Sequence, residues 1–238
     1  MRPIALALLL GRLCLAAHAA GTIACHLESA SPLSRFKTGQ LALLEKLNHA
    51  DRPHLARLSR ILVPNRWDPD ELHYSPMPRE VPELSDRNKA LIVDLAAQVF
   101  GAYESGRLVR WGPVSTGDRR HQTPSGTYHL NWHARVRVSS ENPTWIMPWY
   151  FNFSSDRGLG LHQYALPGRP ASHGCTRLLA TDAQWIFNWG EGWSTDGDTG
   201  EPSETGTLVL IVGKYDFKAP QPWLQPRWWS QGVSLSLP

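Results

Sequence analysis

The chain has 238 residues, enough for one well-packed domain and a smaller additional segment. Its 24 Lys and Arg residues nearly balance its 21 Asp and Glu residues, so the formal net charge is only +3. This balance lacks the strongly basic character typical of nucleic-acid-binding proteins, and we expect no nucleic acid partner.

Residues 1–20 have the features of a signal peptide. Arg2 supplies a positive start, residues 4–10 form an apolar run, and a small-x-small cleavage site follows at Ala17-His18-Ala19. The apolar run is too short to span a membrane, and no later segment reaches spanning length. We therefore expect an exported protein of the periplasm or cell envelope without a stable membrane span. The cleavage site itself is left open.

Cys25 lies close to this segment and raises the question of lipid attachment. Acylated cysteines usually follow a leucine three positions earlier, and Thr22 stands at that position here. We therefore do not expect a lipoprotein.

Residues 26–64 are predicted to be helical. Leucines recur at helical spacing in residues 39–48, and apolar residues repeat that spacing in residues 55–62. Pro64 ends the pattern. Two short helices of this kind resemble a degenerate LysM-type wall-binding module, and a plain helical hairpin packed on the main domain is the alternative.

Residues 65–87 are rich in proline, which is disfavoured inside both helices and sheets. We interpret this segment as a linker or an extended strap. The main domain is predicted to follow it, at residues 88–215, and residues 216–238 are interpreted as a C-terminal tail.

The main domain is predicted to be mainly β. Apolar strands are expected at residues 90–95 and 207–212, and a hairpin with a Ser-Gly turn at residues 99–111. Many short strands with glycine and proline turns are typical of a β-sandwich or a barrel-like domain. One helix is expected after residue 180, with a capping box at residues 181–184 and its end at Gly190.

Aromatic residues gather at Trp145, Trp149 and Tyr150. Core packing is the default interpretation for each of them, although the segment could also form a wall of a substrate groove.

A thiol stands among basic side chains in the segment Ser172-His173-Gly174-Cys175-Thr176-Arg177. If the segment is extended, His173, Cys175 and Arg177 share one face of a strand. The imidazole and the guanidinium would then favour the reactive thiolate. The backbone N–H groups of Gly174 and Cys175 could donate hydrogen bonds to a developing oxyanion.

His162 lies thirteen positions before Cys175, and a turn-rich stretch separates the two. A pair of neighbouring strands would bring this imidazole beside the thiol. His162 is therefore the better candidate for the general base, because His173 sits too close in sequence for an unstrained contact.

Three other interpretations of Cys175 remain open. His162, His173 and Cys175 have suitable chemistry for zinc, although no fourth ligand is evident. A Cys25–Cys175 disulfide is conceivable in an exported protein, but one bridge does not make a disulfide framework. A buried structural cysteine fits poorly with so polar a segment.

The cysteine segment together with His162 resembles the signature of bacterial L,D-transpeptidase catalytic domains. Further stretches agree in order, namely residues 92–95, 103–106, 114–117 and 123–128. The resemblance covers roughly residues 88–215. Two features depart from the pattern: Gln163 stands where the family often has glycine, and residues 191–206 have no clear counterpart.

The resemblance implies that Cys175 attacks a peptidoglycan stem peptide, releases the terminal D-alanine and forms a thioester that an amine resolves. His162 would take the thiol proton. Ser172, His173 and Gly174 would orient the network or hold the oxyanion, and Arg177 would orient the motif or bind substrate carboxylates. The resemblance implies no cofactor and no metal, and also sensitivity to carbapenems. We expect a monomer.

Two alternatives stand beside this function. Water could replace the amine, which would make the protein an L,D-carboxypeptidase or an enzyme that detaches wall-bound protein. The chain could also be a non-catalytic wall-binding protein with a silent site.

Overall fold

A computed structural model describes residues 23–195, 202–225, 227–228 and 232–237. The predicted signal peptide lies outside these residues. The α-helices are α1 (Thr38–Leu47), α2 (Arg52–Leu55) and α3 (Ala180–Trp189). Short 3-10 turns are η1 (Leu33–Arg35), η2 (Glu71–Tyr74), η3 (Pro82–Leu84) and η4 (Pro222–Leu224). The strands are β1 (Cys25–Ser29), β2 (Arg60–Pro64), β3 (Lys89–Asp94), β4 (Val99–Glu104), β5 (Arg107–Ser115), β6 (Gly126–His129), β7 (His133–Val138), β8 (Ile146–Ser154), β9 (Leu159–Gln163), β10 (Thr176–Leu178), β11 (Ser194–Thr195), β12 (Pro202–Glu204) and β13 (Leu208–Val212).

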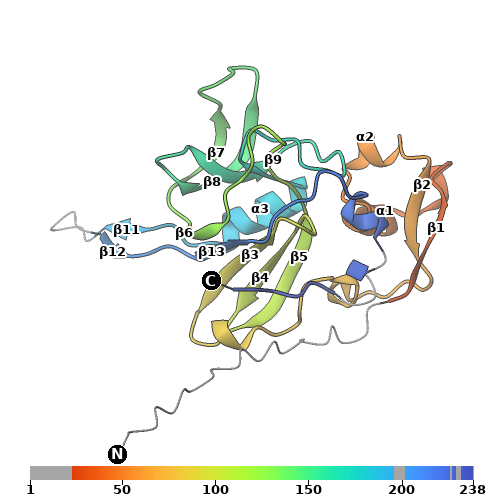
Figure 1. The fold of residues 1–238 in the computed structure, drawn as a ribbon, viewed down its shortest axis with the longest axis horizontal. Coiled ribbons are helices and arrows are strands. Elements are labelled where there is room, and N and C mark those ends of the chain that lie inside the picture. Colours follow the sequence, from red (N-terminus) through yellow and green to blue (C-terminus); the bar gives the residue numbers. More distant parts are fainter. Residues whose placement is uncertain (1–22, 196–201, 226, 229–231, 238) are drawn as a thin grey trace, which may run out of the picture.

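The fold is mainly β, as the sequence predicts. Nine strands form one curled sheet in the order β6-β13-β3-β4-β5-β10-β9-β8-β7 (Figure 1). Neighbouring strands are antiparallel except for two parallel pairs, β13 with β3 and β10 with β9. The predicted hairpin is present as β4 and β5, and the predicted strand at residues 207–212 is β13.

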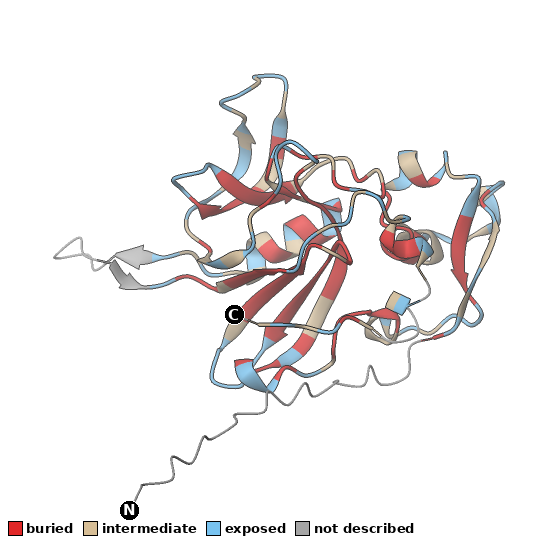
Figure 2. Cartoon of the chain, in the orientation of Figure 1, coloured by how far each residue is buried: buried red, intermediate tan, exposed pale blue. Residues whose placement is uncertain are grey.

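Two hydrophobic cores lie on opposite faces of the central strands, because successive side chains of a strand point to opposite faces. Ile92 of β3 belongs to a core shared with α1. Its neighbours Leu91 and Val93 belong to a second core, where β8, β9 and α3 close over the sheet. Figure 2 shows buried residues running through the central strands and α3. The second core therefore gives the curled sheet its sandwich-like interior.

The prediction of an entirely helical segment at residues 26–64 is wrong in part. Helix α1 is present, but α2 ends at Leu55, and Ile61 and Leu62 belong to β2. β2 pairs with β1 in a separate two-stranded sheet. The apolar spacing of residues 55–62 fits a helix, yet Ile61 and Leu62 are instead buried in a strand that ends at Pro64.

Of the two interpretations of residues 65–87, a linker or an extended strap, the packing favours the strap. Tyr74, Met77, Val81 and Leu84 are buried in the core that β3 and α1 share. The tail is packed as well, since Trp223 is buried and the N–H of Val233 donates to the carbonyl of Pro76. Proline-rich sequence here makes an extended strap that closes the core, and the predicted domain boundaries stay predictions.

Helix α3 begins at Ala180, one residue before the predicted capping box, and its N-cap Leu179 makes no side-chain cap. The box is absent because Thr181, its predicted N-cap, lies in the first turn of the helix. The next residue, Asp182, has a different role. Its buried carboxylate pairs with the Arg110 guanidinium at 2.7 Å and lies 3.7 Å from the Lys46 ammonium. This ion cluster links α1, β5 and α3. The predicted end of the helix at Gly190 is confirmed.

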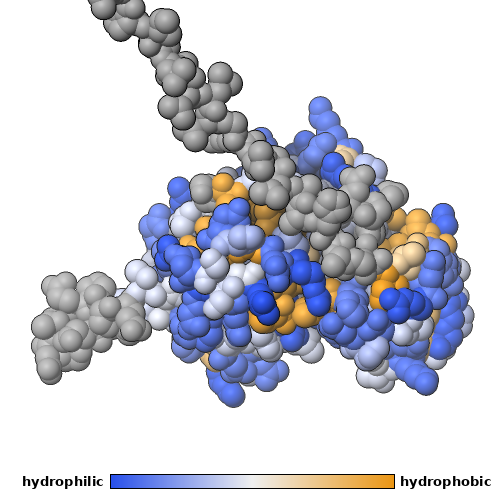
Figure 3. All heavy atoms as spheres, turned by 90° about the horizontal axis from the view of Figure 1, so that it is seen from below, coloured by the Kyte–Doolittle hydropathy of each residue, from blue (hydrophilic) through white to orange (hydrophobic). Residues whose placement is uncertain are grey.

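Residues 191–206, which the sequence left without a counterpart, include the short antiparallel pair β11 and β12 (Figure 1). Residues 196–201 lie outside the described part. Among the described residues, no helix is both long and apolar enough to cross a membrane. Hydrophilic side chains dominate much of the described surface seen from below, with apolar groups between them (Figure 3).

Candidate active site

The parallel strands β9 and β10 form the base of the candidate site. Their register pairs His162 with Arg177, so the two side chains predicted to act with the thiol stand on neighbouring strands. Cys175 immediately precedes β10. The prediction that paired strands bring His162 near the cysteine segment is confirmed at the level of the backbone.

Ser172 holds the cysteine segment in a bend. Its hydroxyl donates to the carbonyl of Cys175 and accepts the N–H of Gly174 at 3.1 Å. The expected extended strand is therefore wrong for residues 172–175. His173 and Cys175 do not share a strand face with Arg177, and the Gly174 N–H is engaged by Ser172 rather than held ready for an oxyanion.

Gly174 is required by the geometry of this bend. Its φ is +107°, a conformation that other residues rarely adopt, and a Cβ there would come within 2.9 Å of Leu159. The hydroxyl of Thr123 donates to the Gly174 carbonyl at 2.7 Å and accepts the N–H of Gly117 at 2.9 Å. The bend is thus fixed to the loop after β5.

The Cys175 thiol is half-buried, with its sulfur 3.9 Å from the carbonyl of Gly158. Burial raises the pKa of this thiol above its usual value. A hydrogen bond from the Gly160 backbone and the positive charges of Arg137 and Arg177 oppose the rise. The expectation that flanking cations favour the thiolate holds for Arg177, but burial has the larger effect, and the pKa of the thiol stays above its usual value.

His162 is buried and uncharged at neutral pH. Burial lowers the pKa of its imidazole to about 4, and the charges of Arg177 and Arg137 act in the same direction. Its Nδ1 lies 2.9 Å from the carbonyl of Gln163. Since a carbonyl only accepts, Nδ1 carries the proton and Nε2 has a free lone pair. The imidazole therefore has the protonation state that a general base needs.

Gln163, the residue that departs from the family pattern, therefore orients His162 through its backbone. Its carbonyl is available whatever the side chain, so the departure does not remove this hydrogen bond.

His173 has a different setting. Its Nδ1 pairs with Glu141 at 3.1 Å, its ring stacks on His121 at 4.2 Å, and the edge of Trp145 lies against it. These contacts hold His173 at the mouth of the site, on the side of the loop between β7 and β8.

Arg177 lies against Tyr164, with the guanidinium carbon 4.6 Å from the ring centre. Its Nη1 donates to the carbonyl of Ala165 at 3.5 Å. The guanidinium is therefore held by the segment that follows β9.

One cavity collects five of the six predicted residues: His162, Ser172, His173, Cys175 and Arg177. Gly174 supports it through the bend. Sequence reasoning missed three charged residues of this cavity, Arg137, Glu141 and Arg157. In the sequence, Arg137 lies in an alternating stretch that indicates only a strand, and Glu141 lies in a polar stretch that indicates only a loop. The curl of the sheet brings these residues to the cavity that holds Cys175. Trp145 also lines the cavity, whereas Tyr150 is buried and stacks on His162.

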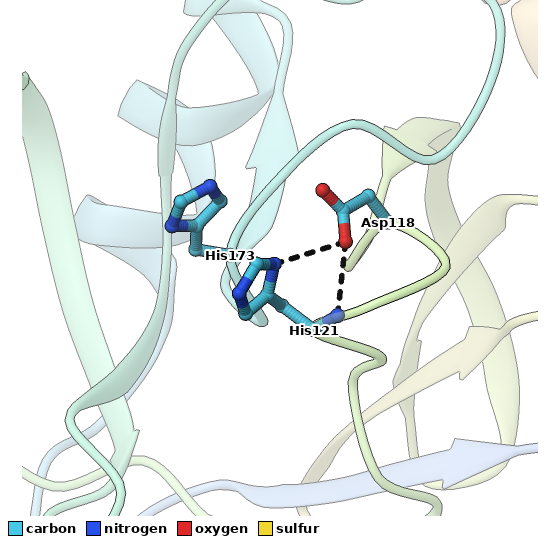
Figure 4. A group of neighbouring side chains, drawn as sticks. All are labelled: Asp118, His121 and His173. Atoms are coloured by element: carbon cyan, nitrogen blue, oxygen red, sulfur yellow. Dashed lines mark hydrogen bonds and ion pairs between the residues drawn. The ribbon is translucent and has the colours of Figure 1, made fainter.

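The metal-ligating side chains that come together in the described chain differ from the zinc set considered above. They are Asp118, His121 and His173, whose ligand atoms lie within 4.8 Å of one another (Figure 4). Asp118 already accepts the N–H groups of Arg120 and His121 and pairs with the His121 ring at 3.0 Å. The guanidinium groups of Arg119, Arg120 and Arg169 line the same hollow. Their positive charge disfavours a cation there. We assign no metal to this cluster.

The disulfide alternative is wrong, because Cys25 and Cys175 are both free thiols. Cys25 begins β1 in the small N-terminal sheet, opposite Pro64 of β2. Its thiol donates to the carbonyl of Ile23 at 3.4 Å.

The family model of the YkuD L,D-transpeptidase catalytic domain matches residues 88–211, more than half of the chain. The protein therefore belongs to this family. The match includes the cysteine segment, His162 and the strands that carry them. Among curated proteins, none matches this sequence.

Solved structures resemble the same part of the chain. An L,D-transpeptidase from Stackebrandtia nassauensis is 23% identical over 54% of this chain and 57% of its own, with a TM-score of 0.44. One from Mycobacterium smegmatis is 17% identical over 53% and 59%, with a TM-score of 0.42. One from Mycobacterium tuberculosis H37Rv is 22% identical over 53% and 58%, with a TM-score of 0.41. The chain thus spans less than two thirds of each.

Proposed function

We propose that this protein is a peptidoglycan L,D-transpeptidase with Cys175 as its nucleophile. Its substrate is a tetrapeptide stem, from which it releases the terminal D-alanine and transfers the remaining acyl group to an amine. The observation that carries the proposal is that a buried, neutral His162 and the Cys175 thiol line one cavity. Membership of the L,D-transpeptidase family supports the substrate class.

The reaction begins with a proton transfer. Nε2 of His162 accepts the Cys175 proton as the sulfur attacks the carbonyl of the third stem residue. The resulting tetrahedral oxyanion is held by hydrogen-bond donors beside the thiol, and the Cys175 N–H is the nearest candidate. The imidazolium then protonates the departing amine of D-alanine, leaving a thioester and a neutral His162.

The second half of the reaction repeats these steps with an incoming amine. His162 accepts a proton from the amine as it attacks the thioester carbonyl, and then returns that proton to the sulfur. The products are a new amide bond and the free Cys175 thiol. Because the thioester keeps the free energy of the cleaved peptide bond, the reaction needs no nucleotide.

The remaining residues of the bend position these groups. Ser172 fixes the carbonyl of Cys175, and Gly174 allows the backbone to turn at the thiol. His173 borders the entrance, and Arg177 supplies positive charge close to the sulfur. The features of residues 1–20 support export to the periplasm or cell envelope, and we propose that the mature protein acts there as a monomer.

The test is incubation of the purified mature protein with tetrapeptide muropeptides, followed by mass analysis. Release of D-alanine together with a cross-linked dimer is the expected result. Tripeptide without a dimer would identify a carboxypeptidase, in which water resolves the thioester. Recovery of unchanged tetrapeptide by folded protein would overturn the enzymatic proposal and favour a wall-binding role.

A further inference from the structure

Arg137 enters the cavity from the strand farthest along the sheet. It lies near the end of β7, opposite Met147 of β8. Its guanidinium carbon is 4.6 Å from the ring centre of Tyr150 and 4.8 Å from that of Trp132. The two rings hold the guanidinium, while the residue lines the same cavity as Cys175 and His162.

The Nη1 atom of Arg137 is buried and has no hydrogen-bond partner among the described residues. A shielded charged donor without an acceptor is costly, and an anion supplies what it lacks. The guanidinium also contacts the Tyr150 side chain, but this contact leaves Nη1 unsatisfied. The two ring centres lie only 5.2 Å from each other, so both rings pack on one side of the guanidinium and leave its N–H groups available to a planar anion.

No acidic residue of the cavity is placed to satisfy Arg137. Glu141 is the acidic residue that lines it, and its carboxylate pairs with His173. The other two arginines of the cavity already have partners. Arg157 lies 3.6 Å from Asp156, and Arg177 is held by the carbonyl of Ala165.

The charge of Arg137 also reaches the reacting groups. Burial is the main cause of the raised pKa of Cys175 and of the lowered pKa of His162, and in both cases Arg137 is among the charges that contribute. Because Arg137 and Cys175 line one cavity, an anion bound at Nη1 would occupy the same cavity as the bond that Cys175 attacks.

We propose that Arg137 binds a carboxylate of the stem peptide within one residue of the scissile bond, and so selects acidic peptides over their amides. This inference rests on the proposed function. Two carboxylates meet the description: the side-chain carboxylate of the third residue, in stems where that residue is a diamino dicarboxylic acid, and the terminal carboxylate of D-alanine. Both offer the planar pair of oxygens that a guanidinium recognises.

The experiment measures peptide binding by calorimetry in Cys175→Ala protein, which holds substrate without turnover. The ligands are the acidic tetrapeptide, its third-residue side-chain amide and its C-terminal amide. Arg137→Gln should weaken binding of the acidic peptide about ten- to a hundredfold. For the amide peptide in which the recognised carboxylate is blocked, Arg137→Gln should not change the affinity. For the other amide peptide, which keeps that carboxylate, the substitution should still weaken binding.

Two variants serve as controls. Arg135→Gln removes an arginine of the same strand that stacks on Trp149 and is not among the residues lining the cavity, so binding should not change. Arg137→Lys keeps the charge and should recover part of the affinity.

Equal weakening for all three peptides would overturn the proposal, because it would mean that Arg137 only supports the packing of β7. Unchanged binding by Arg137→Gln would also overturn it. A third outcome is that binding depends on the carboxylate, but protein with an intact Cys175 releases no D-alanine. This outcome would contradict the proposed function and still support the carboxylate site. Absence of binding to every peptide would overturn both.

Discussion

The two thiols of the described chain, Cys25 and Cys175, are both free and half-buried, yet their surroundings differ. Around Cys25, burial alone raises the pKa, to about 11. Around Cys175, burial also raises the pKa, but the Gly160 N–H and two guanidinium groups oppose it. A buried base, His162, lines the same cavity.

Shielding a thiol therefore makes it inert unless the same site supplies charge and a proton acceptor. The N-terminal sheet shields Cys25 and adds neither. The cavity shields Cys175 from bulk water and adds both.

Replacing Cys175 by Ala should abolish D-alanine release, because no other described thiol lies in the cavity. Replacing Cys25 by Ala should leave the rate unchanged. Both variants should keep the circular dichroism spectrum of the unaltered protein. The contrast would be broken if the Cys175 variant retained turnover, or if both variants lost it while still folded.

A carbapenem should acylate Cys175 and spare Cys25. The lactam carbonyl offers the sulfur the same kind of target as the stem carbonyl, and the oxyanion donors serve both reactions. Intact-mass measurement should find one added drug mass, and Cys175→Ala should show none. An adduct mapped to a Cys25 peptide would reverse the assignment.

Replacing His162 by Ala should slow D-alanine release about a hundredfold or more, the usual cost of losing a general base. His173→Ala should have a smaller effect, because Glu141 and the neighbouring rings hold that imidazole at the entrance. The measurement is the steady-state rate of D-alanine release by each variant. A larger loss in the His173 variant would assign the base to that residue instead.

The pH dependence of activity and of alkylation should distinguish a neutral His162 and Cys175 thiol from a preformed imidazolium and thiolate. Since the pKa of His162 is lowered to about 4, the base stays neutral as pH falls through 6.5, and activity should fall off only near pH 4. Since the pKa of Cys175 is raised, its alkylation by iodoacetamide should keep rising with pH above 9. A plateau of alkylation between pH 5 and 8 would indicate a resting thiolate and contradict this description.

The same alkylation experiment compares the two thiols directly. At a pKa of about 11, Cys25 has roughly a hundredfold less thiolate than an ordinary cysteine at neutral pH. Cys175 should therefore react faster than Cys25, as peptide mapping of partly labelled protein would show. Equal rates would mean that the charges around Cys175 do not reduce the effect of its burial on the pKa.

Much of the chemistry in this contrast is local in sequence, and that part was predictable. His162, the cysteine segment and the hairpin of β4 and β5 are encoded by short patterns. The bend at residues 172–175 was missed because a hydrogen bond from Ser172 and the positive φ of Gly174 override the alternation of a strand.

The missed elements depend on long-range contacts. Ile61 and Leu62 fit a helical spacing, and only pairing with β1 makes them a strand. Arg137 reads as an exposed residue of an alternating strand, and only the curl of the sheet carries it over Cys175. Such positions are set by the packing of distant segments, which spacing within one segment does not reveal.

The smallest expected effect concerns the stability that Cys25 contributes. Its side chain fills a half-buried position in β1 and makes one hydrogen bond, to Ile23. Cys25→Ala removes a sulfur without adding a polar group, so the free energy of unfolding should fall by only about 1 kcal/mol. A thermal melt should shift by roughly 2–4 °C. If Cys25 is only a packed residue of the small sheet, turnover measured below the melt should stay unchanged, as should carbapenem acylation of Cys175. A loss of turnover without a matching loss of stability would mean that Cys25 acts on the cavity, and the separation of the two thiols into a shielded and a reactive one would fail.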